Sequence, residues 1–553
     1  MNSYCTDLKL RDPKIVMNPE RLGNMHQSRI SFVRVLIRKM TNQKWKVKKT
    51  SWEFCSRGFG YAIYTLNTPT NVYNLFISSD EISSSERNDR VIAEKWDVTF
   101  ALVSGNIDSK LLDNLRSNIP LQEIGRNSNK VLVLSRANKS MRVFEHILNC
   151  LSIGKQPNSE ELARVGYILR TTAVYGNGKF GIADFSLLKN NPDFSQSFSA
   201  QMCAVYILRE FSLDFLDYLA IQKGGKKAVS LSRSFRRYLG VGNATGLGMA
   251  PYLIRHPCVV DQWMTSREMA LSTIFNKEID TLKLPFFKSL IQRAIEYFSQ
   301  SFTIDEVQKK INLITTNELK DFYNHFELFC QESSNWEYFI KKIDKMHFSA
   351  QEVVLVCLME LYPDLVDKFE NHMNTDETLE LPVGKKVEDM LEVLENRYAW
   401  AISEDFSNPD NSYWFWYSSQ DKEEPRLGIR QEDEGSDKEL PLDIGRQAHN
   451  FYNALKQSPI KLSLVEFLIK NPAYRTIARR VWTLSNKRMG EIQMNVLSKC
   501  SLPIHLLRCK LAAFGATKFD PRSDRWVRIT LFQGAPLLDE LHENEWLFPL
   551  IPS

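Results

Sequence analysis

Closely spaced cysteines are missing from this sequence. It contains nine cysteines in 553 residues, but no two of them stand in a C-x-x-C arrangement. Its nine histidines are dispersed as well, and no H-E-x-x-H motif occurs. Disulfide scaffolds and thiolate or histidine zinc sites depend on such spacings, so the pattern argues against both and fits a reducing compartment. We expect no dedicated metal site.

Long apolar runs are missing too. No stretch of about 18 apolar residues occurs, and the chain does not open with the charged and then apolar segments of a signal peptide. The composition of 43% hydrophobic and 25% charged residues is that of an ordinary globular protein. These features predict a soluble, cytoplasmic protein that does not associate with a membrane.

Glycine is scarce outside one part of the chain. Ten of the 23 glycines fall between Gly166 and Gly248. Four of them lie in the segment 240–248, GVGNATGLG, and three in the segment 176–181, GNGKFG. Because glycine reaches backbone angles closed to other residues and lets a ligand approach the main chain, both segments are predicted to be loops. A helix expected over 201–222 joins them and could place them at one cleft.

Glycine-rich loops of this kind are suited to binding anions. Their successive backbone N–H groups form a concave, partly positive surface, and arginine is the usual side-chain partner of a bound phosphate or carboxylate. We therefore predict a phosphorylated or carboxylated small-molecule ligand at the loops 176–181 and 240–248. The predicted ligand-binding residues are Gly240, Gly242, Asn243, Thr245 and Gly246 in one loop, Asn177, Gly178 and Lys179 in the other, and Arg170, Arg236 and Arg237 beside them.

The two glycine segments do not match the standard nucleotide-binding motifs. The G-x-G-x-x-x-G spacing follows a helix-like segment instead of a strand, and Lys179 is not followed by serine or threonine. Two acid–base candidates lie nearby: His256, whose ordinary pKa suits proton transfer near neutral pH, and Asp184. A transferase or ligase acting on a phosphate- or carboxylate-bearing substrate is the expected enzyme class, and no cofactor is indicated.

The N-terminal part of the chain reads as strands. Segments rich in aromatic and branched residues at 45–54, 60–66 and 71–78 are separated by turn residues, which predicts an antiparallel meander. Further strands are expected near 95–103 and 131–134.

Most of the remaining chain is predicted to be helical. Thr303 and Ser349 each stand three residues before a glutamate, which is the capping-box pattern of a helix start. The other expected elements are helices over 159–169, 444–455, 463–483 and 502–514, an acidic surface loop over 421–439, a buried strand at 413–417 and a terminal strand at 526–532.

The expected fold class is α+β and predominantly helical. The chain is long enough for several domains. We expect an N-terminal α+β domain with the meander over 1–150, a glycine-rich ligand-binding region over 151–250, a helical domain over 251–400, and a C-terminal helical domain over 401–553 that ends in a short strand-containing segment.

Basic segments support an alternative function. Residues 21–60 carry ten Lys or Arg and a single acid, and a helix expected over 30–40 places arginines on one side. This side is either a solvated basic face or a contact for an anion or nucleic acid. The alternative is thus a nucleic-acid-binding protein that uses the segments 29–49 and 233–246.

Two further interpretations stay open. In the terminal segment four cations alternate with two acids, either in a charged turn that closes the fold or as a third contributor to the anion site. They are Lys518, Arg522, Arg525 and Arg528, with Asp520 and Asp524. As a second alternative function, the chain is a non-catalytic helical interaction protein whose glycines only allow helices to cross closely.

Overall fold

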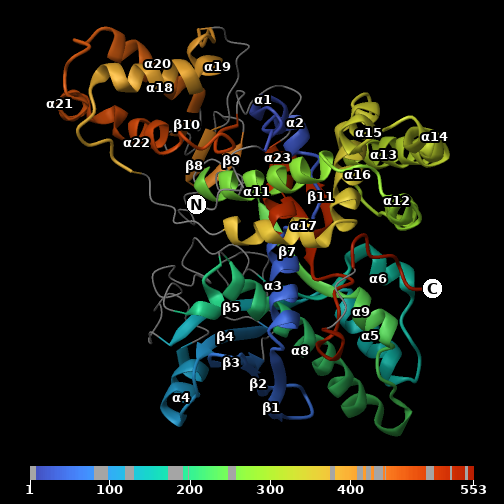
Figure 1. Cartoon of the computed structure of the whole chain (residues 1–553). Helices are drawn as coiled ribbons and strands as arrows, with labels where there is room; N and C mark the ends of the chain where they lie inside the picture. Colours follow the sequence, from blue (N-terminus) through green and yellow to red (C-terminus); the bar gives the residue numbers. More distant parts are fainter. Residues whose placement is uncertain are drawn as a thin grey trace.

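The protein is an α+β chain that is mostly helical, as predicted. Figure 1 shows one large sheet that runs from the lower part of the molecule (β1 to β5) up to its middle (β7, β11), with helices around it. The computed structural model describes residues 8–79, 97–118, 130–171, 191–196, 198–246, 257–373, 380–407, 415–418, 425–428, 440–441, 444–492, 503–523, 526–541 and 546–553.

A nine-stranded sheet organises the fold, in the order β1-β2-β3-β4-β5-β6-β7-β12-β11. Its first five strands pair antiparallel in sequence order, which confirms the predicted meander. The β6–β7 pair is parallel, and the other neighbouring pairs are antiparallel. The strands are β1 Lys46–Phe54, β2 Gly60–Asn67, β3 Val72–Ser79, β4 Val98–Ser104, β5 Val131–Lys139, β6 Tyr167–Thr171, β7 Gly240–Gly246, β11 Ala516–Ser523 and β12 Trp526–Leu531.

Two helices cover opposite faces of the meander. Residues alternate between the faces of a strand, and in β3 Leu75 belongs to the main core whereas Phe76 belongs to a smaller one. The main-core face packs against α8 (Ser199–Gly224). The other face packs against Leu111 and Leu115 of α4 (Ser109–Asn118). Being covered on both sides, β3 and β4 are almost entirely buried.

The parallel pair of strands is joined by the long helix expected over 201–222, which is confirmed as α8. Parallel neighbours require such a crossover. The helix predicted over 159–169 is only partly correct, because α6 spans Ser159–Val165 and β6 begins at Tyr167. Gly166 between them adopts a left-handed conformation (φ +80°) that ends the helix.

Helices surround the sheet on several sides. In Figure 1, α12 to α15 gather at the upper right around α16, whose residues are nearly all buried, while α11 and α17 cross the middle of the molecule. The helices near the sheet and the chain ends are α1 Pro13–Val16, α2 Pro19–Leu22, α3 Phe32–Asn42, α5 Val143–Ser152, α9 Arg233–Tyr238 and α23 Pro503–Phe514, and the central ones are α11 Pro257–Phe275, α12 Leu284–Gln300, α13 Glu306–Asn324, α14 Phe326–Gln331, α15 Trp336–Ile343, α16 Phe348–Glu360 and α17 Pro363–Val366.

Both predicted capping boxes of the central region are wrong in detail. The N-cap of α13 is Asp305, whose side chain accepts a hydrogen bond from the Gln308 amide, and not Thr303. Ser349 lies inside α16, where it is fully buried and its hydroxyl accepts a hydrogen bond from Thr315. A hydroxyl that has a tertiary partner is not available to cap its own helix.

A second hydrophobic core lies apart from the sheet, at the upper left of Figure 1. It is built by α18 Val387–Arg397, α19 Ala399–Ile402, α20 Ile444–Lys456, α21 Leu464–Lys470 and α22 Arg475–Thr483. The inserted strands β8 Phe415–Ser418, β9 Pro425–Gly428 and β10 Leu440–Pro441 form a small sheet. The expected strand at 413–417 is thus found as β8, whereas β9 interrupts the predicted loop 421–439.

The predicted domain boundaries stay predictions, but the sheet crosses several of them. It takes β6 and β7 from the expected glycine-rich region, and β11 and β12 from the expected C-terminal domain. Among the described residues, no helix has the length and apolarity to cross a membrane.

The basic N-terminal helix is packed inside the protein. Arg34 of α3 is 1% exposed and donates to Glu360 of α16 at 2.8 Å. Arg38 of the same helix pairs with Glu370 at 2.9 Å. The expected solvated basic face is therefore wrong, because a buried arginine requires a carboxylate partner. Burial also removes these arginines from the nucleic-acid surface expected over 29–49.

Candidate functional site

The segment expected to form a glycine loop is a strand over its described part. Gly240–Gly246 is β7, which pairs with β6 on one side and with β12 on the other. Thr245 lies opposite Val527 and Gly246 opposite Trp526 in this ladder. The loop prediction for 240–248 is therefore wrong for these residues, because their backbone hydrogen bonds are taken by the neighbouring strands.

Close packing explains two of the glycines in β7. A Cβ atom on Gly240 would lie 2.2 Å from the carbonyl oxygen of Leu531, and one on Gly242 would lie 2.5 Å from the ring of Tyr167. Glycine in a strand often marks such a close approach. The expectation that these glycines allow helices to cross is wrong as well, since their neighbours are a strand and an aromatic ring.

The strand register gathers basic side chains on one face of the sheet. Arg170 of β6 lies opposite Gly242, and Arg528 of β12 lies opposite Ala244. In β11, Asp520 lies opposite Arg528. Side chains of paired residues point to the same face, so these charged groups lie together over the glycines of β7.

We call this cluster the arginine face and define it by Arg170, Lys518, Arg522 and Arg528 with Asp520, around the ring of Tyr167. The charged groups act on one another at short range: Arg528, Arg170 and Arg522 all lower the pKa of Tyr167, although burial outweighs them and raises it. The sequence pattern pointed to Lys518, Arg522 and Arg528, but it could not place them beside Arg170. Arg525 and Asp524, which the same pattern includes, lie outside the described residues.

The arginine face has more positive than negative charge. Its single described carboxylate, Asp520, is fully buried, and its Oδ2 accepts from Nη1 of Arg522 at 3.2 Å. Burial raises the pKa of Asp520, and the neighbouring cations oppose that shift. The side chains of Arg170 and Arg528 form no hydrogen bond or ion pair with any residue in the described ranges. Half-buried arginines without a carboxylate partner are suited to an anionic ligand.

Burial also weakens the proton affinity of the lysine in this cluster. Lys518 is 8% exposed, and its ammonium donates to the backbone oxygen of Ala163. Burial, reinforced by Arg528 and Arg522, lowers the pKa of Lys518 to about 8. The side chain is still mostly protonated at neutral pH and adds to the positive charge.

The arginine face adjoins one edge of the sheet. Since β6 and β7 are parallel, the chain leaves both strands at the same edge, after Thr171 and after Gly246. In sheets with parallel strands, ligands commonly bind beyond such carboxyl ends. The predicted residues Asn177, Gly178, Lys179, Asp184 and His256 lie outside the described residues, and their roles stay predictions.

Three of the other predicted ligand residues do not favour ligand binding at the arginine face, because they pair with carboxylates or lie elsewhere. Arg236 pairs with Asp217 at 2.7 Å and with Asp214 at 3.1 Å, and Arg237 lies 3.7 Å from Glu540. Asn243 is fully buried and lies opposite Ile529, on the face of the sheet away from the arginine face. Of the predicted arginines, only Arg170 lies on the arginine face.

Metal binding and disulfide formation receive no support from the described ranges. No group of three His, Cys, Asp or Glu side chains there is arranged to hold a metal ion. No disulfide joins the cysteines of these ranges.

The chain matches no protein-family model, no curated protein and no solved structure. Its function must therefore be argued from its own residues.

Proposed function

We propose that the protein binds a phosphorylated or carboxylated small molecule on the arginine face. The observation that carries this proposal is the pair Arg170 and Arg528, which flank the glycine face of β7. Among the described residues, their side chains form no ion pair with a carboxylate, since Asp520 pairs with Arg522. Two guanidinium groups on neighbouring strands offer a forked set of N–H donors to one anion.

The proposed ligand is bound as part of an enzymatic reaction of the transferase or ligase type. The acid–base candidates remain His256 and Asp184. In the sequence, Asp184 follows β6 and His256 follows β7, and these two strands are parallel neighbours in the sheet. A cytoplasmic location is part of the proposal, and it rests on the scattered cysteines.

The nucleic-acid alternative receives less support. Arg34 and Arg38 of the segment 29–49 are buried in ion pairs. In the segment 233–246, Arg233 and Arg236 also pair with carboxylates. The lysines of β1 are exposed and could contact a nucleic acid. Exposed lysines are equally common on any strand that faces solvent, so they do not favour this function.

Calorimetric titration tests the proposal with inorganic phosphate, pyrophosphate, citrate and ATP as probes, each at low and at high salt. We expect at least one probe to bind. Replacing Arg170 or Arg528 by alanine should weaken that binding roughly tenfold to a hundredfold, the usual effect of losing a hydrogen bond to a charged group.

The matched control is Arg233→Ala, which removes an exposed arginine of α9 that pairs with Asp539 and Glu540 and does not belong to the arginine face. It should bind the probe as the parent protein does. Failure of all four probes, or equal affinity in the parent and in both arginine variants, would refute the proposal. Binding of an oligonucleotide alone, lost steeply as salt rises, would favour the nucleic-acid alternative instead.

A further inference from the structure

A pocket lies on the other face of the sheet from the arginine face. It has a volume of about 370 Å³ and is lined by residues of β1, β2, α8 and α9 and by the chain around Leu537. Tyr64 of β2 lies opposite Leu75, whose side chain belongs to the main core beneath α8. The volume is within the range of small-molecule sites.

Most charged groups of this pocket have strong internal partners. The Oδ2 atom of Asp214 accepts from Nζ of Lys49 at 3.0 Å and from the Tyr64 hydroxyl at 2.8 Å, and its Oδ1 accepts from Arg236 at 3.1 Å. Arg233 pairs with Asp539 at 2.9 Å. The positive groups of the lining are therefore already neutralised.

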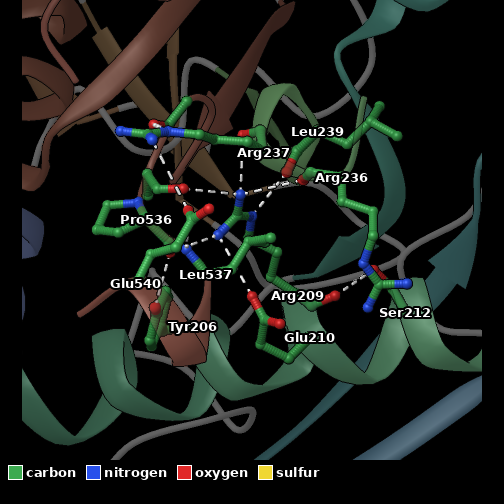
Figure 2. Close-up of polar contacts among 12 residues, drawn as sticks. Tyr206, Arg209, Glu210, Ser212, Arg236, Arg237, Leu239, Pro536, Leu537 and Glu540 are labelled. Carbon is green, nitrogen blue, oxygen red and sulfur yellow. Dashed lines mark hydrogen bonds and ion pairs between the residues drawn. The ribbon is translucent and has the colours of Figure 1, made fainter. Parts of the chain in front are cut away.

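Glu210 of α8 is the exception. Its side chain is 8% exposed, lines the pocket, and has one charged contact, with Nη1 of Arg209 at 3.4 Å. Figure 2 shows that the guanidinium of Arg209 is surrounded by other acceptors. It donates to the carbonyl oxygens of Leu239 (2.7 Å), Arg237 (2.8 Å), Ala535 (3.0 Å), Arg236 (3.1 Å) and Pro536 (3.1 Å).

The carboxyl of Glu210 is thus buried at the pocket wall, and its one ion pair with a described residue is long. Burial raises the pKa of Glu210 to about 7. Around it, Arg209 of α8 and Arg236 of α9 lower this pKa, while Asp214 and Asp539 raise it. Tyr206 and Tyr64 also face it and stay neutral, because burial raises their pKa values. A fraction of the molecules therefore holds the Glu210 proton at neutral pH.

We propose that this pocket binds a small organic cation, a primary amine or a guanidine, with Glu210 as its counter-ion. An ammonium or guanidinium group supplies the hydrogen-bond donors that Glu210 lacks, and its charge offsets the cost of ionising a buried carboxyl. The side chains of Leu231, Leu537 and Leu538 in the lining suit the hydrocarbon part of such a ligand. An anion finds no unpaired cation in this lining.

Titration calorimetry of the full chain with agmatine and with putrescine tests this proposal, with 1,4-butanediol as the uncharged analogue. The titrations are run at pH 7 in buffers of different ionisation enthalpy, which reports proton release. We expect an amine to bind, butanediol not to bind, and a fraction of a proton to be released per bound amine, because binding forces Glu210 to ionise.

Glu210→Gln should weaken amine binding at least tenfold and abolish the proton release. Glu53→Gln, which changes an exposed glutamate of β1 that bonds to Tyr61, is the matched control and should leave both unchanged. Phosphate binding at the arginine face should be the same in both variants. The amine site at Glu210 and the anion site at the arginine face are therefore tested independently.

Three results would overturn the proposal: no binding of either amine to the folded parent protein, equal binding in Glu210→Gln, or amine binding without proton release. The last measurement needs no variant, so the test stands even if Glu210→Gln does not fold.

Discussion

Arg34 and Glu360 form a buried ion pair that connects helices 326 residues apart in the sequence. The Nη2 atom of Arg34 lies 2.8 Å from Oε2 of Glu360, and the two side chains are 1% and 5% exposed. Arg29 also reaches Glu360, at 3.4 Å, and pairs with Asp367 at 2.7 Å. The basic N-terminal segment is therefore part of the contact between α3 and the central helices.

Replacing Arg34 by methionine should destabilise the protein by about 3 kcal/mol, the lower end of the usual effect of breaking a buried pair, because Glu360 then keeps, among the described residues, its longer contact with Arg29. Urea unfolding measures the change. The control is Lys288→Met, which breaks a pair with the more exposed Glu327 and should cost less than about 1 kcal/mol. Similar losses of unfolding free energy in the two variants would show that the buried Arg34 pair stabilises the protein no more than an exposed pair does.

Gly242 should not tolerate even a methyl group. Its Cβ would lie 2.5 Å from the Tyr167 ring, so Gly242→Ala should cost about 1–3 kcal/mol of stability, as overpacking typically does. In the background Tyr167→Ala the same substitution should cost much less. Urea unfolding of the four proteins gives this coupling. An unchanged cost in the double variant would mean that the ring is not what excludes the methyl group.

The strands of the meander could be predicted because they carry their own signal. Aromatic and branched residues recur along β1, β2 and β3, and turn residues separate these strands. The long helix α8 was also recognisable, since it is apolar over many turns. In such elements local preference and tertiary packing agree.

Strand β7 gave no such signal. Its sequence GVGNATG has a single branched apolar residue, Val241, and glycine is depleted in strands. What makes it a strand is pairing with β12, whose residues come about 280 positions later. The neighbourhood of Arg170 and Arg528 follows from the same pairing. Contacts this distant in sequence leave no trace in local composition, so the arginine face could not be assembled from the sequence.

Arg209 should be hard to replace even by lysine. Its guanidinium donates to five backbone carbonyl oxygens while being fully buried. An ammonium has three donors, so Arg209→Lys leaves buried carbonyls without a partner and should cost about 3 kcal/mol, measured by urea unfolding. The control Arg164→Lys changes an exposed arginine of α6 and should be nearly neutral. A loss of stability no larger than the control's would contradict the geometry of Figure 2.

Glu210 should make the protein less stable as pH rises. Its pKa is about 7 in the folded protein against 4.5 for an ordinary glutamate, so between these values the folded state holds more protons than the unfolded chain. Stability conferred by the protonated carboxyl is complete below pH 4.5 and is lost toward pH 7. The free energy of unfolding of Glu210→Gln, measured by urea unfolding, should therefore exceed that of the parent by up to about 3 kcal/mol at pH 8 but by little at pH 4.5. A difference independent of pH would contradict the raised pKa.

Lys518 should have the opposite effect at alkaline pH. Its pKa is about 8 in the folded protein against 10.5 for an ordinary lysine, so between these values the unfolded chain holds more protons than the folded one. The penalty of burying the charged ammonium is full below pH 8 and disappears as pH rises toward 10.5, so this group makes stability increase with pH.

Other groups titrate in the same range, and the difference in stability between the parent and Lys518→Met isolates the contribution of this lysine. Between pH 7.5 and 10.5, the free energy of unfolding of the parent should rise by up to about 3 kcal/mol relative to that of Lys518→Met, as measured by urea unfolding. Because Arg522 and Arg528 contribute to the lowered pKa, Arg528→Ala should reduce that gain. A flat difference across this range would mean that Lys518 is solvated and that the arginine face is more open than its buried groups indicate.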